Sequence, residues 1–138
     1  MTTIFKKIID GQVPADLVYE DDTVLVFLDI QPIRKGHALI IPKEPYVDIF
    51  DIPADTFAHM AMVAQKIARA LMLVTKAQGV NLHMNNGEAA GQDVFHAHLH
   101  VIPRFERGEA FERNSHESYG VGESARIAAE LRKNLHSI

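Results

Sequence analysis

The chain has 138 residues, of which 47% are hydrophobic and 23% charged, as in an ordinary soluble globular protein. Its net charge of −4 argues against broad electrostatic binding to nucleic acid or to an anionic membrane, and its lack of cysteine excludes disulfides and thiolate metal sites. No apolar run approaches the roughly 20 residues of a membrane-spanning helix, and the opening MTTIFKKIIDG lacks the features of a secretory signal, so we expect a cytoplasmic protein.

The first third of the chain predicts a short helix followed by three strands. Residues 2–11 carry apolar side chains at helical spacing and end at a glycine. Two β-rich runs at 17–21 and 23–30 flank a tight acidic turn and predict a hairpin. A third strand is expected over 36–43, where an apolar run ends at proline.

The hydrophobic period changes after Pro53. From there to about Gln78, apolar residues recur at i, i+3, i+4 and i+7, which predicts a long helix with Gly79 at the C′ position. The remaining elements expected in chain order are a strand, a glycine-containing loop, a strand and a terminal helix, over residues 80–86, 86–93, 94–103 and 123–136.

Together these elements predict an α+β fold with a five-stranded, mainly antiparallel sheet packed against one long helix, and short helices near both ends of the chain. We expect a single domain over residues 1–138, with its core at about 3–104 and a tail and helix at about 105–138. The long helix covers one face of such a sheet, which leaves the other face for a further element or a second subunit.

The stretch HAHLHVI (96–102) places three histidines at every second position. Alternate side chains of a strand share one face, so His96, His98 and His100 would project together, roughly 6–7 Å apart, while the intervening apolar residues face the helix. Three interpretations compete: a solvated or hydrogen-bonded polar face, a zinc site of the His-x-His kind, and phosphoryl chemistry in which a neutral imidazole attacks phosphorus.

The preceding loop NNGEAAGQD (85–93) favours phosphoryl chemistry. Asn85 and Gln92 offer amide donors, and Gly87 and Gly91 let backbone N–H groups approach a ligand. Such donors suit phosphate better than a bare metal ion, although NNG by itself is also a common turn.

The histidine stretch and the motifs before it resemble those of a known protein family. HAHLHVI resembles the His-φ-His-φ-His-φ-φ signature of the histidine triad (HIT) superfamily of nucleotide-binding hydrolases and transferases. The resemblance extends over about residues 3–104, through IFKKIIDGQVPA, VLVFLDIQPIRKGHALIIPK and NNGEAAGQDVFHAHLHVIPR. The chain is most similar to the small bacterial members of the Hint-type branch. This implies a HIT-like fold, no cofactor or metal, and a homodimer formed through the long helix and a neighbouring strand.

The resemblance also implies the roles of four histidines. His98 matches the nucleophile that attacks the α-phosphate and becomes a nucleotidyl-histidine. His96 is expected near the departing group, and His100 near a non-bridging phosphate oxygen. His37 matches the fourth histidine that supports this cluster, although by residue type it could equally be a satisfied, partly buried histidine.

The nucleotide contacts implied by the resemblance come from three parts of the chain. Asp29 matches the carboxylate that accepts the ribose hydroxyls, although it could equally be a turn carboxylate. The phosphate-side residues would be Asn85, Gly91 and Gln92. The apolar slot for the purine base would consist of Phe5, Ile8, Phe27 and Ile30, four residues that by type could also be ordinary core.

The sequence departs from the family pattern at two points. Many members have Ser or Thr directly after the Gly-Gln pair, where the hydroxyl helps the phosphate or the leaving group, but this chain has Asp93. A carboxylate there would repel phosphate unless it turns away. Several relatives also carry an N-terminal Cys-x-x-Cys zinc site, which the cysteine-free chain cannot form.

The expected function is hydrolysis of a nucleoside monophosphate derivative, such as an AMP phosphoramidate, through His98. The alternatives are a dinucleoside polyphosphate hydrolase of the same superfamily, a histidine-rich metal-binding protein, and a non-catalytic nucleotide-binding or scaffold protein. Segment 115–120 could reach a partner's pocket. The other histidines, expected as ordinary surface or packing residues, are His59, His83, His116 and His136.

Overall fold

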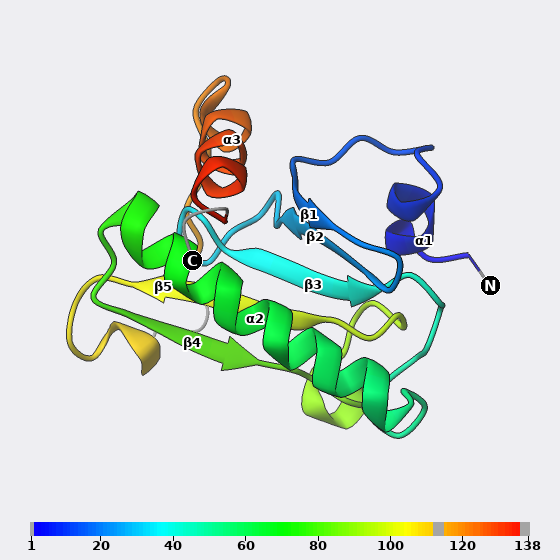
Figure 1. Ribbon diagram of the computed structural model, residues 1–138. Coiled ribbons are helices and arrows are strands. Elements are labelled where there is room, and N and C mark those ends of the chain that lie inside the picture. Colours follow the sequence, from blue (N-terminus) through cyan, green and yellow to red (C-terminus); the bar gives the residue numbers. More distant parts are fainter. Residues whose placement is uncertain (1, 112–114, 136–138) are drawn as a thin grey trace.

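The computed structural model describes residues 2–111 and 115–135 and contains every expected helix and strand (Figure 1). A helix, two strands of a hairpin and a third strand come first, followed by the long helix, two further strands and the terminal helix. Their bounds are α1 (Ile4–Ile9), β1 (Leu17–Glu20), β2 (Val24–Leu28), β3 (Ala38–Pro42), α2 (Ala54–Thr75), β4 (Gly79–His83), β5 (Leu99–Arg104) and α3 (Glu123–Leu135). Two short 3₁₀ turns, η1 (Glu88–Ala90) and η2 (Glu109–Phe111), lie in the loops. His136, the last residue of the expected terminal helix, lies outside the described residues.

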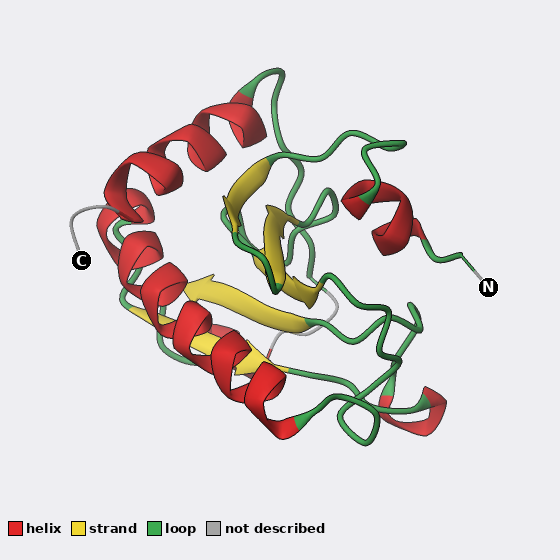
Figure 2. Ribbon diagram, turned by 45° about the vertical axis from the view of Figure 1, so that its right-hand side comes forward, coloured by secondary structure: helices red, strands yellow, loops and turns green. Residues whose placement is uncertain are grey.

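The five strands form one antiparallel sheet in the order β1-β2-β3-β5-β4, which confirms the predicted α+β architecture. α2 lies across one face of this sheet, and α1 lies on the other side of it (Figure 2). The register brings histidines from different strands together, because His100 of β5 pairs with Leu39 of β3 on one side and with His83 of β4 on the other.

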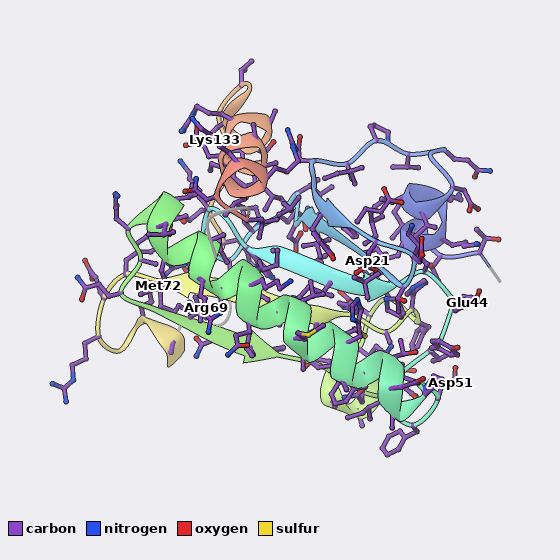
Figure 3. All side chains as sticks on the ribbon, in the orientation of Figure 1. Asp21, Glu44, Asp51, Arg69, Met72 and Lys133 are labelled. Atoms are coloured by element: carbon purple, nitrogen blue, oxygen red, sulfur yellow. The ribbon has the colours of Figure 1, made fainter. Side chains whose placement is uncertain are left out.

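The main core lies between α2 and the sheet. Met60, Ile67 and Leu71 of α2 are fully buried there, and burial of each such side chain stabilises the fold by about 1.5–3 kcal/mol. By length and composition α2 could also cross a membrane, but core helices share that property, and its apolar stripe contacts the sheet. Arg69 and Met72 lie on its exposed surface (Figure 3).

The opposite face of the sheet carries a smaller apolar cluster beneath α1. Phe5 packs edge-on against Phe27, with 5.5 Å between the ring centroids, and Leu25, Leu39 and Ile41 complete the cluster. Alternation along β2 and β3 supplies both cores, so these two strands are buried on both faces. The β5 residues that alternate with its α2-facing apolar side chains therefore lie on the α1 side of the sheet.

The predicted C-terminal cap of the long helix is wrong. Lys76, not Gly79, adopts the left-handed conformation, with φ of 63°. The Thr75 hydroxyl donates to the Leu71 carbonyl oxygen and accepts from the Ala77 N–H, which turns the chain early. Gly79 is then the first residue of β4 and pairs with Arg104, so it must be extended.

The predicted strand over 94–103 begins five residues later than expected, at Leu99. The carbonyl oxygen of His96 accepts a hydrogen bond from the His98 ring, and the N–H of Ala97 donates to the Tyr46 carbonyl oxygen in the loop after β3. These backbone groups are therefore not available for the sheet. The alternation nevertheless continues, because Ala97, Leu99 and Val101 all join the α2 core.

Candidate active site

A cleft of about 910 Å³ opens on the face of the sheet opposite α2. Its walls come from loop 29–37, the loop at 85–94, strands β4 and β5, and His116 of the segment after β5. His37, His98 and His100 line it together with Asp29. The structure thus brings four predicted site residues into one cleft: His37 lies 63 positions from His100 in the chain, but the two rings meet where β3 pairs with β5.

His98 has a hydrogen bond that decides which ring nitrogen can react. Its Nδ1 lies 2.7 Å from the His96 carbonyl oxygen, which can only accept, so Nδ1 carries the proton. The lone pair of the neutral ring is then on Nε2. Phe5 packs edge-on against the ring at a centroid distance of 4.9 Å, and this contact restricts its rotation. His98 thus presents one oriented nucleophilic nitrogen at the cleft.

His37 and His100 form a second oriented pair. The Ile33 N–H donates to Nδ1 of His37 at 3.1 Å, so the proton of the neutral ring is on Nε2. That Nε2 lies 2.8 Å from Nδ1 of His100 and donates to it. Nε2 of His100 therefore carries a proton and is a donor, and no group in the described ranges 2–111 and 115–135 accepts it. This donor suits an oxygen of a bound phosphate.

Burial keeps these imidazoles uncharged. Burial lowers the pKa of His37 from 6.5 to about 3 and that of His100 to about 2. It also lowers the pKa of His98, although the His96 carbonyl and the carboxylates of Asp93 and Asp29 oppose that shift. A neutral His98 at physiological pH retains the lone pair that a nucleophile needs.

His96 does not fit the role implied by the resemblance. Its side chain is 0% exposed and does not line the cleft, so it cannot contact a departing group directly. Nε2 donates to the Pro42 carbonyl oxygen at 2.7 Å, and Nδ1 is buried without a hydrogen-bond partner among the described residues. His96 anchors the segment before β5 to the end of β3, and its carbonyl oxygen orients His98.

The phosphate-side loop places its three predicted residues differently. Asn85 and Gly91 line the cleft, and the Asn85 amide donates to the Gly91 carbonyl oxygen at 3.3 Å. Gln92 is buried, and its amide is used within the loop: it accepts from the Gly87 N–H and donates to the Val47 and Val94 carbonyl oxygens. Gln92 therefore holds the loop in shape, which corrects its expected contact with phosphate.

The ribose carboxylate is at the cleft, but the expected base slot is only partly formed. Asp29 lines the cleft with its Oδ1 accepting from the Gln31 N–H, and burial raises its pKa. Of the four apolar residues only Phe5 lines the cleft. Phe27 is buried beneath it and Ile8 packs against the same cluster, whereas Ile30 is 79% exposed and outside the cleft. Residue type alone could not distinguish residues that line the cleft from residues that pack beneath it.

Two further histidines reach the cleft, although the sequence pattern predicted ordinary roles for both. His83 lies opposite His100 in the β4–β5 register, with the ring centroids 5.1 Å apart. The sequence signal that could have predicted this position is that His83 and Asn85 lie two residues apart on the expected strand and so share one face of it. His116 donates through Nδ1 to the Gln31 carbonyl oxygen, and no local pattern predicted that contact across 85 positions. His59 has a structural role and pairs with Asp21 at 2.7 Å.

Segment 115–120 lies against loop 29–37 of its own chain. The Glu117 N–H donates to the Pro32 carbonyl oxygen, and the Glu117 carboxylate accepts from the Lys35 N–H. The Tyr119 hydroxyl accepts from the Gly36 N–H at 3.0 Å. Since this loop carries Asp29 and leads to His37, the segment braces both functional side chains within one chain.

A metal ion is a poor match for this hydrogen-bond pattern. Asp29, His37 and His100 have possible ligand atoms within 4.8 Å of one another. His37, however, cannot offer a lone pair on Nε2 while Nδ1 accepts from Ile33, because a neutral imidazole has only one. Coordination through Nε2 would break that bond and the bond to His100. The arrangement instead matches a hydrogen-bonded site for an anion.

Comparison with known proteins identifies the family to which the chain belongs. Residues 10–107 match the HIT domain family. The chain is 39% identical to Protein hit of Bacillus subtilis over 97% of this chain and 94% of that protein. It is 37% identical to Adenylylsulfatase HINT3 of Arabidopsis thaliana, over 98% of this chain and 70% of that one. A crystal structure of a zinc-bound histidine triad family protein from Mycobacterium smegmatis superposes with a TM-score of 0.85 at 40% identity, covering 99% and 95% of the two chains.

Proposed function

The chain belongs to the HIT domain family, and we propose that it hydrolyses AMP derivatives, such as phosphoramidates, through a covalent nucleotidyl intermediate on His98. The observation that carries this proposal is the orientation of His98, whose Nδ1 proton is held by the His96 carbonyl oxygen. The only lone pair of the ring is then available at the cleft. The Arabidopsis relative is named as an adenylylsulfatase, which supports hydrolysis of an adenylyl conjugate.

The reaction has two displacements. In the first, Nε2 of His98 forms a bond to the α-phosphorus as the bond to the leaving group breaks, and the leaving group departs with the electron pair. In the second, water attacks phosphorus, the P–N bond to His98 breaks, and AMP is released. Division of one difficult displacement into two easier ones is the advantage of covalent catalysis.

The surrounding residues supply binding and charge stabilisation. Nε2–H of His100 donates to a phosphate oxygen, and its direction is set by the bond from His37. Asp29 accepts the ribose hydroxyls at the cleft wall. Phe5 offers an apolar surface beside His98. These groups need no metal ion to act on phosphate.

His98→Asn is the sharpest test of the nucleophile. The amide nitrogen of Asn can take the place of Nδ1 and donate to the His96 carbonyl oxygen, while the reactive Nε2 is removed. We expect kcat on an AMP phosphoramidate to fall by about 10³-fold or more, with the dissociation constant for AMP within about threefold of the wild-type value. His59→Gln, outside the cleft, is the control.

Mass spectrometry of quenched reactions should detect an AMP adduct on a peptide that contains His98. Normal turnover by His98→Asn would exclude this nucleophile. AMP binding without turnover of any conjugate would favour a non-catalytic binding protein, and a dinucleoside polyphosphate as the preferred substrate would favour the other hydrolase alternative.

The proposal includes a homodimer formed through α2 and β4. β4 is an edge strand, and the surface between it and α2 is apolar. Met62 of α2 is 51% exposed and Leu82 of β4 is 55% exposed. Exposed apolar side chains clustered in this way are typical of an interface. Sedimentation at micromolar concentration should give the dimer mass, whereas a monomer mass would contradict this part of the proposal.

A further inference from the structure

Asp93 occupies the position where the family pattern has Ser or Thr, and it does not turn away from the site. Its side chain lines the same cleft as His98 and Asp29. Among the residues that the structure describes, none hydrogen-bonds or ion-pairs with the Asp93 carboxylate. The preceding residue, Gln92, is buried and held by three hydrogen bonds, so the backbone at Asp93 is well positioned. The Asp93 backbone is therefore held in position, while its carboxylate has no hydrogen-bond or ion-pair partner among the described residues.

The Asp93 charge acts on the reacting centre. Its carboxylate favours the protonated form of His98 and thereby raises the pKa of that ring, against the larger effect of burial. It also contributes to the raised pKa of Asp29, although burial is again the main cause. Both effects require Asp93 to be near these side chains. A conjugate bound at His98 therefore occupies the same cleft as the Asp93 carboxylate.

The cleft has little positive charge to offset this carboxylate. In the described part of the chain it is lined by two carboxylates, five imidazoles and one guanidinium, that of Arg104. Arg104 is already engaged, since Nε donates to Asn81 at 2.9 Å and Nη1 lies 3.8 Å from the Glu109 carboxylate. Burial keeps His37 and His100 neutral by lowering the pKa of each.

Resting on the proposed function, we propose that Asp93 makes this site select AMP conjugates whose leaving group is cationic, such as amines, over those whose leaving group is anionic. A proton from solvent first converts the bridging nitrogen to a positively charged group that is still bonded to phosphorus. The P–N bond then breaks with its electron pair going to nitrogen, and a neutral amine departs. A nearby carboxylate stabilises the positive charge on the protonated nitrogen. A departing sulfate or carboxylate is instead repelled.

A matched set of conjugates isolates this effect. AMP would be joined through the same P–N bond to alkylamines of equal length that end in an ammonium, a methyl or a carboxylate group. The bond that breaks is then identical, and only the distal charge differs. For the wild-type protein we expect kcat/KM to rank ammonium first and carboxylate last, with about tenfold or more between these two.

Asp93→Asn and Asp93→Ser should reduce that range to about threefold or less. Glu88→Gln is the matched control, because it removes an acidic group from the same loop but outside the cleft, and it should retain the wild-type order. An unchanged order in both Asp93 variants would overturn the proposal, as would a collapse of the order in Glu88→Gln.

Binding separates this proposal from the proposed hydrolase function. Dissociation constants of the three conjugates are measured in His98→Asn and in His98→Asn combined with Asp93→Asn. A preference for the ammonium conjugate that disappears in the double variant supports the Asp93 proposal even if the wild-type protein hydrolyses none of them. Equal affinities for all three conjugates, with normal wild-type turnover of all three at equal rates, would refute it and leave the hydrolase assignment intact.

Discussion

Acid should destabilise this protein through the buried histidines of the cleft. The pKa of His37 falls from 6.5 to about 3 and that of His100 to about 2, chiefly because of burial. Between the ordinary histidine value and these lowered values, the unfolded chain binds protons that the folded chain does not. The free energy of unfolding therefore decreases as the pH falls through this window.

The magnitude follows from proton linkage. For a histidine that stays neutral in the folded state, a change from about pH 7.5 to about pH 5 removes about 2 kcal/mol of stability. His37 and His100 together account for about 4 kcal/mol, a large share of the 5–15 kcal/mol typical of a folded domain. Partial exposure of His100 reduces its part, and the lowered pKa values of His96 and His98 add in the same direction.

Urea unfolding at several pH values tests this reasoning, with stability obtained from the transition midpoint and slope. His37→Gln should lose about 2 kcal/mol less than the wild-type protein over the same pH interval, because one of the neutral imidazoles is gone. Equal losses in both proteins, or no loss in the wild-type protein, would refute the link between burial of these rings and stability.

Three further outcomes follow from the site. Gly91→Ala should lower stability by about 1–2 kcal/mol because the position has a positive φ. It should also lower kcat/KM, because a Cβ there lies 3.4 Å from Nδ2 of Asn85. Gly87→Ala is the control: its φ is similar but a Cβ there meets no atom within 4 Å, so it should show the same stability loss and retain more activity in the same assays. Gln92→Met should lower the free energy of unfolding in urea by about 1–3 kcal/mol, since three backbone groups lose their partner, and an unchanged transition midpoint would contradict the bracing role. Dialysis against a chelator should leave turnover of an AMP phosphoramidate within about twofold of the untreated value, and its loss would support the metal alternative.

The sequence predicted the fold, and the separation of the histidines of 96–102 from the apolar residues between them, because both follow from periodicity. Alternation in HAHLHVI separates Ala97, Leu99 and Val101 from the histidines, and the structure places these apolar residues in the α2 core. Side-chain period is a local property of a strand, so it is readable without knowledge of partners. The same reasoning correctly predicted the long amphipathic helix and its position over the sheet.

The sequence could not predict which ring nitrogens are protonated, which residues line the cleft or which direction Asp93 takes. The backbone partners of His37 and His96, Ile33 and Pro42, are supplied by folding, and they determine tautomer and burial. Composition likewise cannot separate Phe5, which lines the cleft, from Ile30, which is exposed. Periodicity determines the side of a strand on which a residue lies, but only packing between distant segments decides what that side faces.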